Sequence, residues 1–156
     1  MAPPDPHDSP RAFPPPLIYG GCFLLGLGLE RLWPLGELPE AVRHWGGGAL
    51  VLVSLALAAG LLWGFRRQPA SLSTRRPARA LLTEGAFALS RNPGYLSMTL
   101  LCAGLGLWLG SPWTAGMALP AAVLTDRFVI RREEAYLERR FGEDYRRYRA
   151  RVRRWV

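Results

Sequence analysis

The sequence predicts an all-α, integral-membrane helical bundle of about four spans, followed by cytoplasmic amphipathic helices at the C-terminus. Three observations favour this fold class. Long stretches carry no formal charge, and the longest runs from residue 92 to residue 125. All twenty basic residues are arginine, and they gather in a few short segments between the apolar stretches. The last segment is highly charged but repeats apolar residues at helical spacing.

Residues 1–16 are predicted to form a disordered, proline-rich tail, and residues 17–156 a single membrane domain. The tail contains seven prolines, which disfavour a packed structure. It lacks the basic start and apolar centre of a signal peptide, so we expect it to be retained.

The first two spans are expected at about residues 17–33 and 45–65. The first is short, and Glu30 and Arg31 near its end are interpreted as anchors at the membrane surface. The second has 21 residues without a charge. As a helix it would be roughly 30 Å long, which matches the hydrocarbon core of a bilayer.

A polar, arginine-rich loop covers residues 66–91, with a mostly apolar interruption at 80–89. That interruption is too short to cross a bilayer, so we expect it at the membrane surface or folded back onto the bundle.

The uncharged stretch from 92 to 125 is too long for one span, because a single helix would measure about 50 Å. Gly110, Ser111 and Pro112 predict a tight turn inside it, with Ser111 as the cap of the following helix. We therefore predict spans at 93–109 and 112–130. Pro93 predicts a helix start, and Asn92 is expected to cap it by accepting from a free backbone N–H.

The C-terminal helices are predicted over residues 131–154, with Gly142 dividing them. Their apolar stripe is Leu137, Phe141, Tyr145, Tyr148 and Val152. The arginines lie on the other face, which is typical of a helix at a membrane surface.

Arginine counts predict the orientation. With both termini and the 66–91 loop in the cytoplasm, only Arg31 and Arg43 remain near the opposite face. The positive-inside rule favours this arrangement, which requires an even number of spans. The arginines are then explained by topology and by contacts with membrane lipids, so we expect no nucleic-acid partner.

Several kinds of site are excluded by the residues present. The sequence has no Ser/His/Asp set, no nucleotide-type glycine loop and no zinc spacing. His7 and His44 have no ligand-spaced partners, so no metal site is predicted. Cys22 and Cys102 both lie in apolar stretches, where a disulfide framework is not expected.

Three features should instead meet at the cytoplasmic face: the 80–89 stretch, the helix start at Asn92 and Pro93, and the acidic pair Glu133 and Glu134. A helix start offers free N–H donors and suits an anionic ligand group, although a capped membrane helix would have the same sequence. The two carboxylates could be paired with neighbouring arginines, or they could accept hydrogen bonds from ligand hydroxyls.

The order and spacing of these residues resemble the isoprenylcysteine carboxyl methyltransferase and phospholipid methyltransferase superfamily. The similarity covers about residues 75–156 and includes two spans between its first and second motifs. The motifs are Leu81-Leu82-Thr83-x-Gly85-x-Phe87-x-x-x-Arg91-Asn92-Pro93-x-Tyr95, then Glu133-Glu134-x-x-Leu137, then Phe141-Gly142-x-x-Tyr145-x-x-Tyr148.

The resemblance implies a multi-pass enzyme of the bacterial inner membrane that uses S-adenosylmethionine and a lipophilic acceptor of isoprenylcysteine carboxylate type. A phospholipid or thiol acceptor is the alternative within this fold, and a non-catalytic protein that binds lipid or a partner is the alternative class. By motif, cofactor contacts are expected at the following residues: Leu81, Leu82, Phe87, Asn92, Pro93, Gly94, Tyr95 and Glu133. Arg91 or Arg127 could position an anionic acceptor.

The chain departs from the family pattern at three positions. Asn92 stands where the family usually has histidine, so it can donate hydrogen bonds but cannot serve as an acid or base. Phe87 replaces a usual tyrosine and keeps only the apolar wall. Val129 occupies the position of a substrate-contacting arginine in the eukaryotic enzymes.

Overall fold

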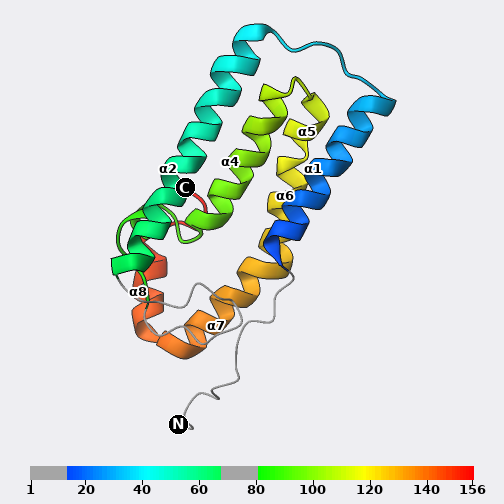
Figure 1. The fold of residues 1–156 in the computed structure, drawn as a ribbon. Helices are drawn as coiled ribbons and strands as arrows, with labels where there is room; N and C mark the ends of the chain where they lie inside the picture. The colour runs from blue at the N-terminus through cyan, green and yellow to red at the C-terminus, as the bar shows by residue number, and fades with distance from the viewer. Residues whose placement is uncertain (1–13, 68–80) are drawn as a thin grey trace.

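The computed structural model describes residues 14–67 and 81–156, and every regular element in these two ranges is helical. Four helical columns lie side by side (Figure 1). They are α1 (Pro15–Leu32), η1 and α2 (Val42–Gly47 and Gly48–Arg67), α4 (Pro93–Trp108), and the consecutive pieces α5 (Pro112–Gly116), α6 (Ala118–Thr125) and η2 (Asp126–Ile130). The all-α class is confirmed, and the columns match the four predicted apolar segments to within about three residues at each end. Residues 1–13 of the predicted tail and Ala80 lie outside the described ranges.

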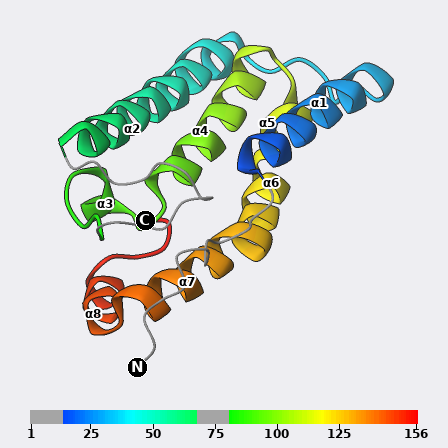
Figure 2. The ribbon, with the colours of Figure 1, turned by 60° about the horizontal axis from the view of Figure 1, so that its bottom comes forward.

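Helix α4 is the centre of the bundle. It packs against η1 and α2 on one side and against α5, α6 and α1 on the other. The short helix α3 (Ala86–Leu89) packs against α2 and the start of α4. The described part of the 80–89 stretch therefore folds back onto the bundle, which was one of the two expected arrangements (Figure 2).

The hairpin between α4 and α5 forms where the sequence predicts it. The Ser111 hydroxyl accepts a hydrogen bond from the Thr114 N–H at 3.2 Å, as expected of an N-cap. It also donates to the Glu30 carboxylate at 2.9 Å, and the same carboxylate accepts from the Trp113 N–H at 3.2 Å. Glu30 therefore joins the end of α1 to the start of α5, in addition to lying near the end of its helix.

The fourth column is not the single helix expected over 112–130. It bends at Met117, between α5 and α6, and continues as the π-helical segment η2. Pro120 explains the break, because it has no N–H to donate to the Gly116 carbonyl one turn earlier.

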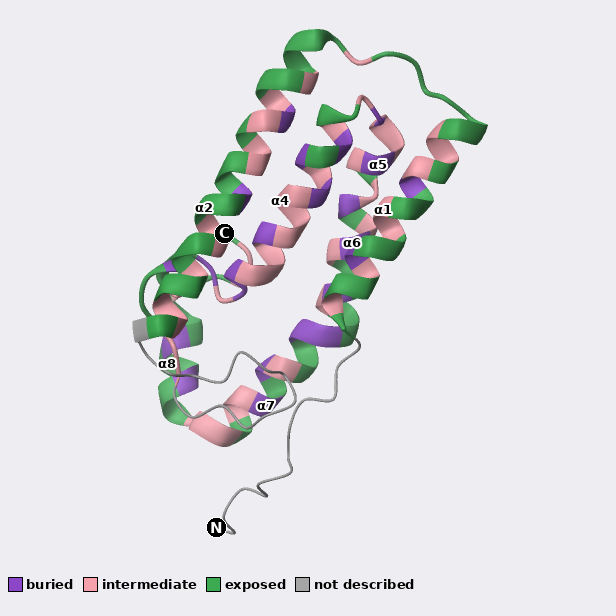
Figure 3. Cartoon of the chain, viewed as in Figure 1, coloured by how far each residue is buried: buried purple, intermediate pink, exposed green. Residues whose placement is uncertain are grey.

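Small residues let the columns approach closely. A Cβ on Gly106 would overlap the backbone nitrogen of Ala115, and a Cβ on Gly26 would lie 2.5 Å from the Thr114 Cα. The buried residues accordingly face the middle of the bundle, whereas the outer faces of α1 and α2 are exposed (Figure 3). Large apolar side chains on the outer faces include Leu24, Leu52, Leu55, Leu62, Leu119 and Val123.

One helix in the described ranges, Val42–Arg66, is long and apolar enough to cross a membrane by the combined test of length and composition. It has 25 residues and a mean hydropathy of 2.1. Very little of it is buried inside the protein, since 6% of its most apolar window is covered.

Two polar helices close one end of the bundle. Helix α7 (Arg131–Phe141) ends at Gly142, whose φ of 52° favours glycine, and α8 (Glu143–Arg151) follows directly. The chain then returns, so that residues 152–156 reach the start of α4 (Figures 1 and 2). The predicted division of the C-terminal helices at Gly142 is confirmed.

Candidate active site

The start of α4 forms one side of the candidate site. Asn92 occupies the N-cap position, and its carbonyl accepts from the Tyr95 and Leu96 N–H groups at 3.1 and 3.0 Å. Pro93 has no N–H, so the Gly94 N–H is the helix-start donor that has no acceptor among the described residues. This backbone donor lies at the N-terminus of α4, which is the positive end of the helix dipole.

The expected capping bond from the Asn92 side chain is wrong. The side chain makes no cap hydrogen bond; its amide instead donates to the Arg154 carbonyl at 3.1 Å. The physical reason is competition, because the returning chain brings the Arg154 carbonyl directly to this side chain. Asn92 is buried, with 9% of its surface exposed. Its side-chain amide donates a hydrogen bond, as expected of a residue that cannot titrate, but the acceptor is a carbonyl of the protein itself.

Tyr95 and Glu133 connect α4 to α7. The Tyr95 hydroxyl donates to a Glu133 carboxylate oxygen at 2.9 Å, and no other hydrogen bond to Glu133 occurs in the part of the chain that the structure describes. Burial raises the pKa of Glu133 to about 7 from its ordinary 4.5, and the Tyr95 hydrogen bond opposes this only in part. The structure therefore brings together two of the residues predicted for the cofactor site, on elements that are 38 residues apart.

The apolar residues predicted for the cofactor site lie in and just before α3. Phe87, on α3, packs its ring edge-to-face on Phe65 of α2, with ring centroids 6.1 Å apart. Its carbonyl accepts a hydrogen bond from the Tyr148 hydroxyl at 2.7 Å, which fixes α3 to α8. Leu81 and Leu82 precede α3 and are half-buried.

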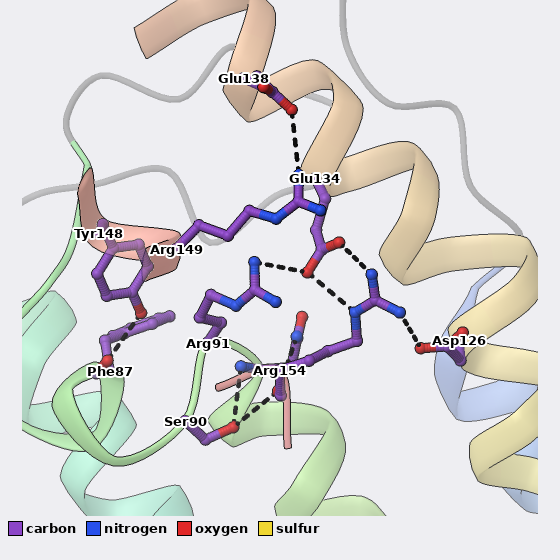
Figure 4. A network of polar contacts seen from close by, with 10 residues as sticks. Phe87, Ser90, Arg91, Asp126, Glu134, Glu138, Tyr148, Arg149 and Arg154 are labelled. Carbon is purple, nitrogen blue, oxygen red and sulfur yellow. Dashed lines mark hydrogen bonds and ion pairs between the residues drawn. The ribbon is translucent and has the colours of Figure 1, made fainter. Parts of the chain in front are cut away.

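The two carboxylates of the acidic pair, Glu133 and Glu134, have different partners. Glu133 faces Tyr95, whereas Glu134 is buried and ion-paired, with one oxygen 3.2 Å from Arg91 Nη1 (Figure 4). The ion-pair reading is therefore confirmed for Glu134, and hydrogen bonding of Glu133 to ligand hydroxyls stays a prediction. Successive residues of a helix point about 100° apart, which is why neighbours can face different partners.

The two arginines predicted to position the acceptor differ in their exposure to solvent. The Arg91 side chain is nine-tenths buried, and its Nε has no hydrogen-bond acceptor among the described residues. Arg127 is exposed on η2 and forms no ion pair within the described ranges. The structure does not join Arg127 to the Tyr95–Glu133 pair.

Comparison with known proteins identifies the family. The family model described as phospholipid methyltransferase matches residues 42–144, about two thirds of the chain. The chain belongs to this family. The match covers Tyr95, Glu133 and the columns that follow α1. The family is part of the isoprenylcysteine carboxyl methyltransferase-like superfamily, so the resemblance is confirmed.

A relative from Haemophilus influenzae, described as an uncharacterized protein, is 42% identical over 62 residues. This alignment covers 40% of the chain and 98% of the relative. No solved structure matches the chain significantly. Membership in the phospholipid methyltransferase family indicates methyl transfer to lipid-type substrates and a membrane-associated protein.

The sequence did not predict Asp126 and Arg154, which make polar contacts that hold the elements of the site together. Nor did it predict the hydrogen bonds of Ser90 and of Tyr148, although Tyr148 belongs to the third motif. The only signal for Arg154 was charge: buried acids require a partner, but eleven arginines follow Asp126 and nothing in the sequence selects Arg154.

No three His, Cys, Asp or Glu side chains come together as a metal site within residues 14–67 and 81–156.

Proposed function

We propose that this chain is an S-adenosylmethionine-dependent methyltransferase that methylates a small lipophilic acceptor at the cytoplasmic face of a membrane. One observation carries the proposal: in a member of the phospholipid methyltransferase family, the start of α4 and Glu133 of α7 are joined by the Tyr95 hydroxyl at 2.9 Å. This places a helix-start donor and a carboxylate acceptor on the same side of the protein.

The residues present fit the chemical groups of the cofactor. Glu133 has one oxygen bonded to Tyr95 and retains acceptor capacity for the ribose hydroxyls. The Gly94 N–H at the start of α4 suits the carboxylate, and Leu81, Leu82 and Phe87 would cover the adenine. When bound, the cofactor supplies an electrophilic methyl group on its sulfonium.

The protein's own contribution is alignment and exclusion of water. Methyl transfer to an oxygen, sulfur or nitrogen acceptor is an in-line displacement that needs no protein nucleophile. Glu133 is half-buried, and the partial loss of water around its carboxyl group, which raises its pKa, is the kind of environment such a displacement favours. Arg91 offers a buried, unbonded Nε to an anionic group, and Arg127 offers an exposed guanidinium at the membrane edge.

The acceptor is proposed to be a lipid, and the family description favours a phospholipid-type acceptor over an isoprenylcysteine carboxylate. The buried Val129 supports this choice, because it occupies the position of the arginine that contacts substrate in the eukaryotic prenylcysteine enzymes. A thiol acceptor would serve the same fold.

The proposed setting is a four-span bundle in the bacterial inner membrane, with both termini cytoplasmic. Trp45 and Trp63 are both exposed and lie at opposite ends of the second column. They are about 27 Å apart along a helix, close to the thickness of the hydrocarbon core, and tryptophan is enriched at both membrane surfaces.

The test is calorimetric titration of the detergent-purified, folded protein with S-adenosylmethionine. The wild type should bind saturably, and Glu133→Gln should weaken binding by about 1–3 kcal/mol, or about 5- to 150-fold, if the carboxylate bonds ribose hydroxyls. Glu143→Gln is the matched control, because that carboxylate is exposed on α8. Labelled cofactor with a panel of phospholipids, lipophilic acids, thiols and amines would identify the acceptor.

Absence of saturable binding by a demonstrably folded protein would refute the enzyme and favour a non-catalytic lipid- or partner-binding protein. Equal affinities for the wild type and Glu133→Gln would refute the role of Glu133 alone.

A further inference from the structure

The residues after α8 form a strap, Val152–Val156, that crosses the start of α4 (Figure 4). Three donors bind its backbone. The Arg91 N–H donates to the Arg153 carbonyl at 3.0 Å, and the Ser90 hydroxyl and the Asn92 amide both donate to the Arg154 carbonyl at 3.1 Å. The backbone of the strap is therefore fixed to the segment that leads into α4.

The Arg154 side chain points in the opposite direction, toward α7 and η2. Its Nε and Nη2 bind the two oxygens of Glu134 at 3.1 and 2.6 Å, and its Nη1 binds an Asp126 oxygen at 3.1 Å. A bidentate guanidinium–carboxylate pair fixes orientation as well as distance. Arg154 is thus one residue whose backbone holds the start of α4 and whose side chain holds α7.

These contacts lie next to the Tyr95–Glu133 hydrogen bond at both of its ends. Asn92 is about one helical turn before Tyr95, and Glu134 directly follows Glu133. Helices α4 and α7 do not pack extensively on each other, so the relative position of Tyr95 and Glu133 depends on links of this kind.

We propose that Arg154 is a positioning residue for the active site: through the strap it fixes the start of α4 relative to α7 and so holds the Tyr95 hydroxyl against Glu133. The inference rests on the proposed function, because the group that it orders is the proposed cofactor site. A displacement of about 1 Å in a catalytic arrangement can cost about 100-fold in rate, so losing this link should affect binding and turnover.

The test uses Arg154→Ala, the conservative Arg154→Lys, and the control Arg151→Ala, whose exposed side chain makes no hydrogen bond or ion pair in the described ranges. Affinity for S-adenosylmethionine should fall at least 10-fold in Arg154→Ala, recover in part in Arg154→Lys, and stay unchanged in Arg151→Ala. The partial rescue follows because lysine keeps the charge but cannot form the bidentate pair.

A second readout does not depend on the cofactor. Hydrogen–deuterium exchange should rise in Arg154→Ala at residues 90–96 and 131–136, and stay unchanged across α1 and α2. If Arg154→Ala does not fold, Ser90→Ala removes one bond to the strap and should show the same pattern at smaller amplitude.

The possible outcomes separate the two proposals. If the wild type binds no cofactor but exchange rises as expected, the proposed function fails and the positioning role stands. If exchange at 90–96 and 131–136 is unchanged, or if the wild type binds the cofactor and Arg154→Ala binds it with the same affinity, the positioning role is overturned. A uniform rise in exchange over the whole bundle would also overturn it, because that pattern indicates general destabilisation.

Discussion

Replacing Glu133 by glutamine should make the stability of the protein less dependent on pH. Glutamine keeps the size of the side chain and can still accept the Tyr95 hydrogen bond, but it cannot ionise. The pKa of Glu133 is about 7 in the folded protein, against an ordinary value of 4.5. At about 1.4 kcal/mol per pH unit, this difference corresponds to about 3 kcal/mol.

The sign follows from which state binds the proton more tightly. Below about pH 4.5 the carboxyl group is neutral in the folded and the unfolded chain, and its titration has no effect on stability. As the pH rises through about 7, the unfolded chain has already ionised while the folded protein must bury a charge, so the wild type loses stability. The free energy of unfolding of Glu133→Gln, measured relative to that of the wild type, should therefore be about 2–3 kcal/mol higher at pH 8 than at pH 5.

The assay is unfolding by a denaturing detergent in mixed micelles at pH 5 and pH 8, followed by tryptophan fluorescence. Glu143→Gln serves as the control, since its exposed carboxylate should give the same small offset at both pH values. A difference between the wild type and Glu133→Gln that is equal at pH 5 and pH 8 would show that the partly buried position of Glu133 does not raise its pKa.

Three further changes test the packing and the polar contacts. Gly106→Ala should lower the free energy of unfolding by about 1–3 kcal/mol, because the added methyl group overlaps the Ala115 backbone; the same unfolding assay measures this. Tyr95→Phe removes the one described donor to Glu133 and should raise the pH midpoint of the stability curve, because that hydrogen bond lowers the pKa of Glu133. Glu30→Ala removes an acceptor shared by the end of α1 and the start of α5, and should lower the Tm measured by dye-based thermal melting.

Matched controls exist for two of these changes. Gly28→Ala places a methyl group where no atom lies within 4 Å, so it should not destabilise the protein as Gly106→Ala does. Glu37→Ala changes an exposed carboxylate in the link after α1, and should leave the Tm unchanged. Equal effects within either pair would contradict the contacts described for Gly106 or Glu30.

Much of the fold could be predicted because its signals are local. The apolar stretches have lengths that fit helical columns, and the positions of Pro93, Ser111 and Gly142 define where helices begin or end. The bend at Met117 was missed, although Pro120 signals it locally.

The candidate site could be predicted only in outline. The hairpin makes the start of α4 and the start of α7 neighbours, which is why Tyr95 lies near Glu133 as predicted. The partner of the Asn92 amide was not predictable, because the Arg154 carbonyl lies 62 residues further along the chain and any residue can supply a carbonyl. Nor could the sequence decide which of Glu133 and Glu134 faces α4, since that depends on how the preceding helix turns.

The π-helical segment η2 determines that turn, and it makes the length of the chain before α7 functionally important. A π turn holds one residue more than an α turn, so η2 absorbs one residue without rotating the helix that follows it. Deleting one residue between Asp126 and Ile130 would therefore restore an α turn and leave Glu133 facing Tyr95. Inserting one residue into the α-helical part of the column would instead rotate α7 by about 100° and turn Glu133 away from Tyr95, although every residue of both motifs would still be present.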